Sequence, residues 1–135
     1  MIKLLADNNA TGHVRVLVRI LMNETWIGFW NDLELAVVTF RDLGLGRKAS
    51  DADLWRTCQR EQVVLITSNR NADRPDSLQT ILREENRSDC LPVFTLADPE
   101  RVGNDRAYAE ETALRLLEYL SQFDSVRGAG RLFLP

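Results

Sequence analysis

The chain has few of the side chains that build metal clusters or cross-links. It contains two cysteines, Cys58 and Cys90, and a single histidine, His13. The cysteines lack C-x-x-C spacing and cannot form a zinc cluster with one histidine. We expect both to be buried, reduced thiols, as is typical of a cytoplasmic protein. His13 is expected to begin the first helix or to lie on the surface.

Several common catalytic motifs are also missing from the sequence. There is no G-x-x-x-x-G-K-[ST] loop for binding nucleotide phosphates, and Gly44-Leu45-Gly46 lacks the third glycine of the dinucleotide-binding fingerprint. No G-x-S-x-G occurs, so acyl transfer through a nucleophile elbow has no support.

The chain contains no long apolar run and no excess of positive charge. Charged residues interrupt each apolar stretch, so we expect no membrane span, and the start of the chain lacks the layout of a signal peptide. The net charge is −3, which argues against a broad basic surface that binds nucleic acid by phosphate neutralisation alone. A small basic groove, or a site in which a divalent ion supplies positive charge, remains compatible with this charge.

The length and composition fit one soluble, globular domain over residues 1–135, with 44% hydrophobic residues. Apolar runs typical of strands occur at residues 2–6, 33–40, 63–66 and 90–96. Helical patterns occur at 14–22, 50–60, 78–86 and 105–123, and residues 24–32 are expected to form a helical extension or a short helix. This alternation predicts an α/β fold with a mostly parallel sheet and helices on both faces.

Two apolar segments leave alternatives open. The tail at residues 131–135 either adds an edge strand or docks on a partner. The aromatic cluster Trp26, Phe29 and Trp30 either caps the core or, together with the tail, forms a homodimer surface.

Polar residues directly follow the predicted strands. They are Asp7-Asn8-Asn9, Arg41-Asp42, Ser68-Asn69-Arg70-Asn71 and Asp98. Because ligands bind at the carboxyl ends of parallel strands, we expect the first and third groups to face one site. Asp51 and Asp53, at the start of a predicted helix, add further carboxylates. Oxygen ligands of this kind suit magnesium or manganese, which activates water and stabilises charge on a phosphodiester.

Each of these residues also has a simpler interpretation. Asp51 and Asp53 favour the helix dipole without any catalytic role, and the asparagines fit turns in which they bond their own backbone. Arg70 either reaches a phosphate or pairs with Asp73, and Arg41-Asp42 is most simply an ion pair. Asp7 is the strongest candidate, because a carboxylate that ends a buried strand must find partners or a cation.

Four segments in order carry a resemblance to a known family. They are Leu5-Ala6-Asp7-Asn8-Asn9, the run from Thr39 to Gly46, Ala49-Ser50-Asp51-Ala52-Asp53-Leu54, and the run from Val64 to Asn71. Over about the first 75 residues, the chain resembles small bacterial PIN-like proteins, which are relatives of VapC-type toxin ribonucleases. The resemblance implies a three-layer α/β/α fold and an acidic, magnesium- or manganese-dependent site that cleaves RNA.

The resemblance also implies roles for individual residues. Asp7 and Asp51 match acidic positions that hold the metal; Asn69 and Asn71 would complete the metal shell or orient water. Asn8 and Arg70 would contact the substrate. The chain departs from the family at Asn8, Asn69 and Asn71, where the family usually has acidic residues, so up to three negative charges are missing. The site therefore either binds metal weakly or has lost or changed its chemistry.

Three functional hypotheses follow from these observations. The first is a metal-dependent ribonuclease acting on single-stranded RNA, a toxin that a small antitoxin-like protein neutralises. The second is a degenerate PIN-like module that binds nucleic acid, a nucleotide or a protein without cleaving. The third is a subunit that works through assembly as a homodimer.

Overall fold

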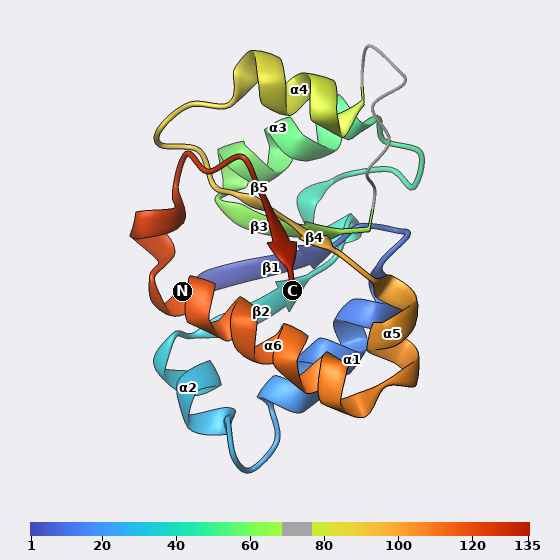
Figure 1. Cartoon of the computed structure of the whole chain (residues 1–135). Coiled ribbons are helices and arrows are strands. Elements are labelled where there is room, and N and C mark those ends of the chain that lie inside the picture. The colour runs from blue at the N-terminus through green and yellow to red at the C-terminus, as the bar shows by residue number, and fades with distance from the viewer. Residues whose placement is uncertain (69–76) are drawn as a thin grey trace.

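The computed structural model describes residues 1–68 and 77–135. These residues form one sheet of five parallel strands in the order β2-β1-β3-β4-β5, together with six α-helices (Figure 1). The α/β fold predicted from the sequence is thereby confirmed. The strands are β1 (Ile2–Ala6), β2 (Leu35–Val38), β3 (Val63–Thr67), β4 (Val93–Leu96) and β5 (Arg131–Leu134). The α-helices are α1 (Thr11–Leu21), α2 (Ile27–Asp32), α3 (Asp51–Glu61), α4 (Leu78–Glu85), α5 (Pro99–Asn104) and α6 (Arg106–Ser121), with 3-10 turns η1 (Arg41–Leu43) and η2 (Phe123–Val126).

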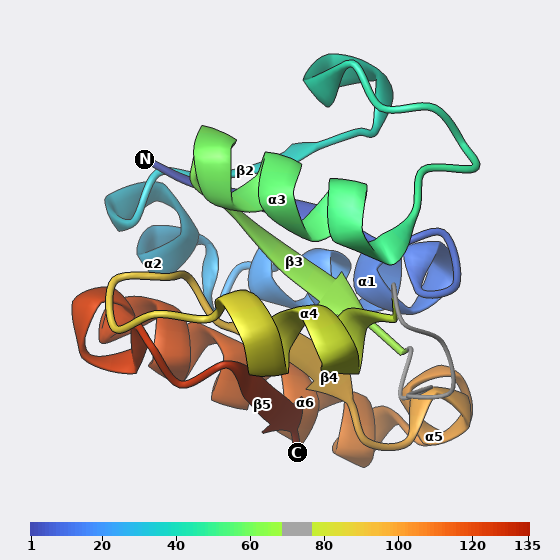
Figure 2. The same ribbon diagram turned by 90° about the horizontal axis from the view of Figure 1, so that it is seen from above.

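The helices cover the sheet from both sides and give three layers (Figure 2). One face carries α1, α5 and α6, which share a core with Leu4, Ile66 and Phe94. The other face carries α3 and α4, which pack on Leu5 and Leu65. The strand order has its switch point at the β1–β3 pair, because β2 is added on one side of β1 whereas β3, β4 and β5 are added on the other. In a doubly wound sheet, the carboxyl ends of such a strand pair are the preferred place for a ligand.

The central strand β3 explains why the middle of the sheet is well defined. All five of its residues are buried, and their sequence is an unbroken β-branched and leucine run that ends in a threonine. A strand that is covered by helices on both faces favours such a continuous apolar run over alternation. The buried polar side chain at its end, Thr67, then needs a hydrogen-bond partner.

Side-chain caps mark the starts of four helices. Ser50, Ser77, Asp98 and Asp105 each accept a hydrogen bond from a backbone N–H in the first turn that follows. Asp98 follows the end of β4, as predicted, and it also caps α5, a short helix that was not predicted.

Several boundaries differ from the predicted ones. Helix α1 begins at Thr11, earlier than the apolar pattern indicated. Strand β4 begins at Val93 rather than Cys90, because Pro92 has no N–H to donate to a neighbouring strand. The tail forms β5, paired in parallel with β4, which is the edge-strand alternative.

The aromatic cluster divides between the core and the surface. Trp30 is buried and Trp26 packs against the same core, whereas Phe29 is 52% exposed. The core-capping interpretation is therefore confirmed for Trp30. None of the described helices combines the length with the apolar character needed to cross a bilayer.

Candidate functional site

Asp7 lies where β1 meets the end of β3. Its N–H donates to the carbonyl of Ile66 (2.9 Å), which extends the pairing of the two strands by one residue. Its half-buried carboxylate accepts hydrogen bonds from the Thr67 hydroxyl (2.8 Å) and from the Asn8 N–H (2.7 Å). The carboxylate is thus held in one orientation at the carboxyl ends of the β1–β3 pair.

Asn9 makes a second connection between the same two strand ends. Its side-chain oxygen accepts from the Ser68 N–H (3.2 Å), and its carbonyl accepts from the Ser68 hydroxyl (3.1 Å). Both residues were predicted to follow strands, but this pairing between them was not predicted. The signal was present in the sequence, because short polar side chains that follow two adjacent parallel strands are within reach of each other.

Asp51 connects the two helices on one face of the sheet. It is the first residue of α3, and its carboxylate accepts from the N–H of Leu78 (3.0 Å), the first residue of α4. Two helix N-termini therefore stabilise its negative charge. Asp53, two residues later, is exposed, which agrees with the simpler interpretation that it favours the helix dipole.

The negative charge of Asp51 affects the pKa of Asp7. Burial raises the pKa of Asp7 above its usual value, and the negative charge of Asp51 raises it further. The hydrogen bonds from Thr67 and from the Asn8 backbone act in the opposite direction. Burial also raises the pKa of Cys58 to about 12, with a contribution from the charge of Asp7. Asp7 therefore sits in a partly desolvated, negative environment that a cation would stabilise.

Asp7 and Asp51 are the two carboxylates from which a metal site would be built. Within residues 1–68 and 77–135, no three His, Cys, Asp or Glu side chains come together in a way that could hold an ion. Magnesium nevertheless commonly binds through one or two carboxylates and keeps several waters. A carboxylate has about four lone-pair sites, and the hydrogen bonds of Asp7 occupy two of them. Asp7 and Asp51 thus fit a weakly held, largely hydrated divalent ion.

The other predicted site residues are distributed differently. Asn69, Arg70 and Asn71 lie outside the described residues. Asn8 is exposed, and its side-chain amide donates to the Arg47 carbonyl (2.9 Å), so it ties the end of β1 to the loop after β2. Its predicted role in substrate contact stays a prediction.

The predicted ion pair between Arg41 and Asp42 is wrong. The Asp42 carboxylate accepts from the Thr39 N–H (2.9 Å), and the Thr39 hydroxyl accepts from the Asp42 N–H (3.2 Å). These reciprocal bonds fix Asp42 to the backbone at Thr39, and Arg41 instead lines a pocket.

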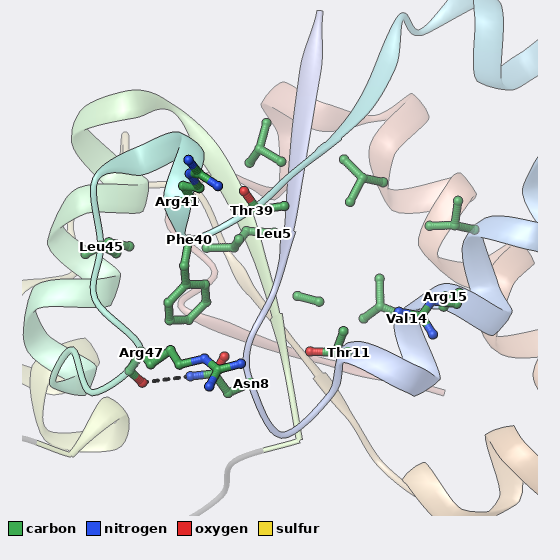
Figure 3. A pocket seen from close by; sticks show the side chains of 14 residues that line it. Leu5, Asn8, Thr11, Val14, Arg15, Thr39, Phe40, Arg41, Leu45 and Arg47 are labelled. Atoms are coloured by element: carbon green, nitrogen blue, oxygen red, sulfur yellow. Dashed lines mark hydrogen bonds between the residues drawn. The ribbon is translucent and has the colours of Figure 1, made fainter.

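This pocket lies beside Asn8 and was not predicted from the sequence (Figure 3). It has a volume of about 560 Å³ and opens at the carboxyl ends of β1 and β2, between α1 and the loop after β2. Most of its walls are apolar: they include Leu5, Val14, Val18, Val37, Phe40 and Leu45. Each of these residues, taken alone, fits an ordinary core pattern, so only their arrangement around a gap reveals the pocket.

No protein-family model, curated protein or solved structure matches the chain. The chemistry of the site therefore has to follow from its own residues. A half-buried carboxylate, a second carboxylate that raises its pKa, and a neighbouring apolar pocket lie along one edge of the sheet. This combination suits an ion that bridges the protein to an anionic substrate.

Proposed function

We propose that the protein is a PIN-like, magnesium- or manganese-dependent endoribonuclease of the toxin type that acts on single-stranded RNA. The observation that carries the proposal is the half-buried Asp7 carboxylate at the β1–β3 switch point, within electrostatic reach of Asp51. These two aspartates match the acidic positions of the PIN-like pattern that the described part of the chain retains. That the charge of Asp51 acts on Asp7 supports the resemblance.

The described residues supply orientation and charge. Asp7 and Asp51 would hold the ion, and the bound ion would activate water and stabilise the charge that develops on the phosphodiester. The Thr67 hydroxyl and the Asn8 N–H fix the Asp7 carboxylate, and the Leu78 N–H fixes that of Asp51. Because the pKa of Asp7 is raised, protons compete with the metal for its carboxylate, and cleavage should weaken as the pH falls through that pKa.

The remaining predicted residues keep their roles within the proposal. Asn69 and Asn71 would complete the shell of the ion or orient water, and Arg70 would steady the phosphate. Asn8 would contact the substrate beside the ion.

The direct test is cleavage of a labelled single-stranded RNA by the purified protein, with manganese or magnesium against a chelator. Asp7→Asn should lower the rate by at least about 100-fold, because it removes the buried charge that holds the ion. Asp32→Asn is the matched control, since Asp32 is an exposed aspartate at the end of α2, before β2 begins. A rate in Asp7→Asn equal to that of the wild type would contradict the assignment of Asp7.

A second candidate function is a PIN-like module that binds nucleic acid or a protein without cleaving. One observation favours this candidate: both oxygens of the Asp7 carboxylate accept hydrogen bonds within the protein. Because these bonds use part of its capacity, the carboxylate is a weaker metal ligand than a free one. Calorimetric titration with manganese separates the two candidates. No heat at millimolar manganese, together with no cleavage, favours the binding module. A dissociation constant in the micromolar range favours the nuclease.

The partners follow from the toxin-type proposal. A small antitoxin-like protein would neutralise the enzyme, and a homodimer could form through the exposed aromatics Phe29 and Phe133, which are 52% and 46% exposed. A monomer in light scattering would remove the homodimer from the proposal.

A further inference from the structure

We infer that the pocket between α1 and the loop after β2 binds one nucleotide of a single-stranded RNA, with the base inside and the adjoining phosphates on the arginines at its rim. The inference rests on the proposed function, because it makes this pocket a substrate subsite beside Asp7. Its volume, about 560 Å³, lies within the usual range for small-ligand sites.

The pocket exists because the sheet is incompletely covered at this edge. Strand β2 is an edge strand that ends at Val38, and the chain then leaves the sheet through η1. Val37, near the end of β2, is 47% exposed. Figure 3 shows Thr11, Val14 and Arg15 on the side of α1, with Phe40, Arg41 and Leu45 on the side of the loop. An apolar space of this kind suits a flat, weakly polar group such as a nucleobase.

The charges around the pocket select an anionic occupant. Arg15, Arg41 and Arg47 line it and are exposed, and no aspartate or glutamate of the described residues lines it. None of the three guanidinium groups forms an ion pair with another residue of the described ranges. Guanidinium groups match phosphate in charge and in hydrogen-bonding geometry.

An aromatic ring gives the pocket a surface for a base. Figure 3 shows the ring of Phe40 pointing from the loop toward Asn8 and Arg47. Stacking of bases on aromatic side chains is the common way to bind single-stranded RNA, and it tolerates any sequence. Apolar walls with one ring and a basic rim therefore favour a nucleotide over an acidic peptide.

The pocket is joined to the proposed cleavage site through the end of β1. Asn8 lines the pocket and follows Asp7 directly, and its amide donates to the Arg47 carbonyl (2.9 Å). This bond sets the position of the loop that carries Arg47 relative to the carboxylate. An RNA strand whose scissile phosphate lies at Asp7 would place a neighbouring nucleotide at this opening.

The test separates binding from cleavage. A short, fluorescently labelled single-stranded RNA is titrated with the full chain carrying Asp7→Asn, in a chelator, and the anisotropy is measured at several salt concentrations. Substituting Arg15, Arg41 or Arg47 by alanine should each weaken binding by about three- to tenfold and reduce the salt slope by about 0.7. Phe40→Leu, which keeps apolar bulk but removes the ring, should weaken binding by about tenfold with an unchanged slope.

Arg19→Ala is the matched control, because Arg19 is exposed on α1 one turn after Arg15 but does not line the pocket. Its affinity should equal that of the parent. RNA binding that none of the three arginine substitutions weakens would overturn the inference. So would the absence of RNA binding at low salt, or binding of a poly-glutamate peptide in its place.

The outcomes also distinguish this inference from the proposed function. Arginine-dependent RNA binding by a protein that never cleaves supports the pocket and overturns the nuclease. Metal-dependent cleavage with unchanged RNA affinity in the arginine and Phe40 variants supports the nuclease and overturns the pocket.

Discussion

The two sides of the carboxyl end of β1, one facing β3 and the other facing β2, are built in opposite ways. On the β3 side, Asp7 and Asn9 are hydrogen-bonded to Thr67 and Ser68, so polar groups of the two strand ends satisfy one another. On the β2 side, apolar walls surround an open pocket, and the arginines at its rim have no ion-pair partners among the described residues.

The difference follows from the position of each strand in the sheet. Strand β3 is central and is covered by helices on both faces, so its end is held firmly against β1. Strand β2 is at the edge, and the chain leaves it early, so its end separates from β1. A rigid negative point beside an open positive cavity is an arrangement in which one side can orient an ion and the other can hold an extended anion.

The largest effect on stability is expected from Asp51→Ala, which acts on the closed side. The substitution removes a charged acceptor from the N–H of Leu78 and takes negative charge from two helix N-termini. We expect a loss of about 2 kcal/mol in the free energy of unfolding, measured by denaturant titration without metal. Asp53→Ala, in the same helical turn but exposed, should lose less than about 1 kcal/mol. Equal losses in the two variants would show that Asp51 only favours the helix dipole.

A smaller effect should separate the two neighbouring asparagines. Asn8→Ala removes the bond to the Arg47 carbonyl, and Asn9→Ala removes the acceptor for the Ser68 N–H. Each should lose about 1 kcal/mol of stability, but in different places. Hydrogen exchange should become faster at Leu45 and Ala49 in the first variant and at Ser68 in the second. Faster exchange at all of these amides in both variants would mean that the β2 side and the β3 side of β1 open together as one cooperative unit.

The pH dependence of stability tests the raised pKa of Asp7. The pKa is higher in the folded protein than its ordinary value of 3.8, so this group contributes stability below pH 3.8 that is lost as the pH rises through the folded pKa. Asp7→Asn lacks this loss. In a chelator, its Tm relative to the wild type should therefore rise as the pH increases from below 3.8 toward neutrality.

The amide is compatible with the same hydrogen bonds. Its oxygen accepts from the Asn8 N–H, while its NH2 donates to the Thr67 oxygen, whose own proton then turns toward the Asn9 oxygen (3.4 Å). A Tm difference that falls as the pH rises would contradict the raised pKa.

The smallest effect concerns the thiols and leaves stability unchanged. Cys58 is buried, and its pKa of about 12 keeps it protonated at neutral pH, whereas Cys90 is half-buried. A thiol reagent should therefore modify Cys90 in the native protein and both cysteines only after denaturation. Rapid modification of Cys58 in the native protein would show that α3, the helix that carries Cys58, opens readily.

The elements that carry their own local signals could be predicted from the sequence. The continuous apolar run of β3 and the serine before α3 define their elements without reference to the rest of the chain. For the tail at residues 131–135, the sequence left two alternatives open, an edge strand or a segment that docks on a partner. Whether a short apolar segment pairs with β4 depends on which edge of the sheet is free, and the sequence alone does not specify this. The predicted thiol burial holds for Cys58 and only in part for Cys90.

The positions of candidate residues could be predicted where they depend on strand ends, and the pocket was missed because it depends on a gap between elements. The position of Asp7 beside the end of β3 could be predicted because a carboxylate after a buried strand has to be stabilised. Arg15 and Arg47 could not, because they come from a helix and a loop whose separation is set by the early end of β2. Arg41 was misassigned for a related reason, since its neighbour Asp42 bonds the backbone of Thr39 instead.

The contact between Asp7 and Thr67 joins residues 60 positions apart in the chain. Closing so long a segment is entropically unfavourable and occurs only when the packing of the sheet repays it, so this contact should appear late in folding. No fragment or partly folded intermediate that lacks the β1–β3 pairing would then hold the carboxylate in this orientation. Protection of the Asp7 and Ser68 amides from hydrogen exchange should consequently return later during refolding than the helical signal.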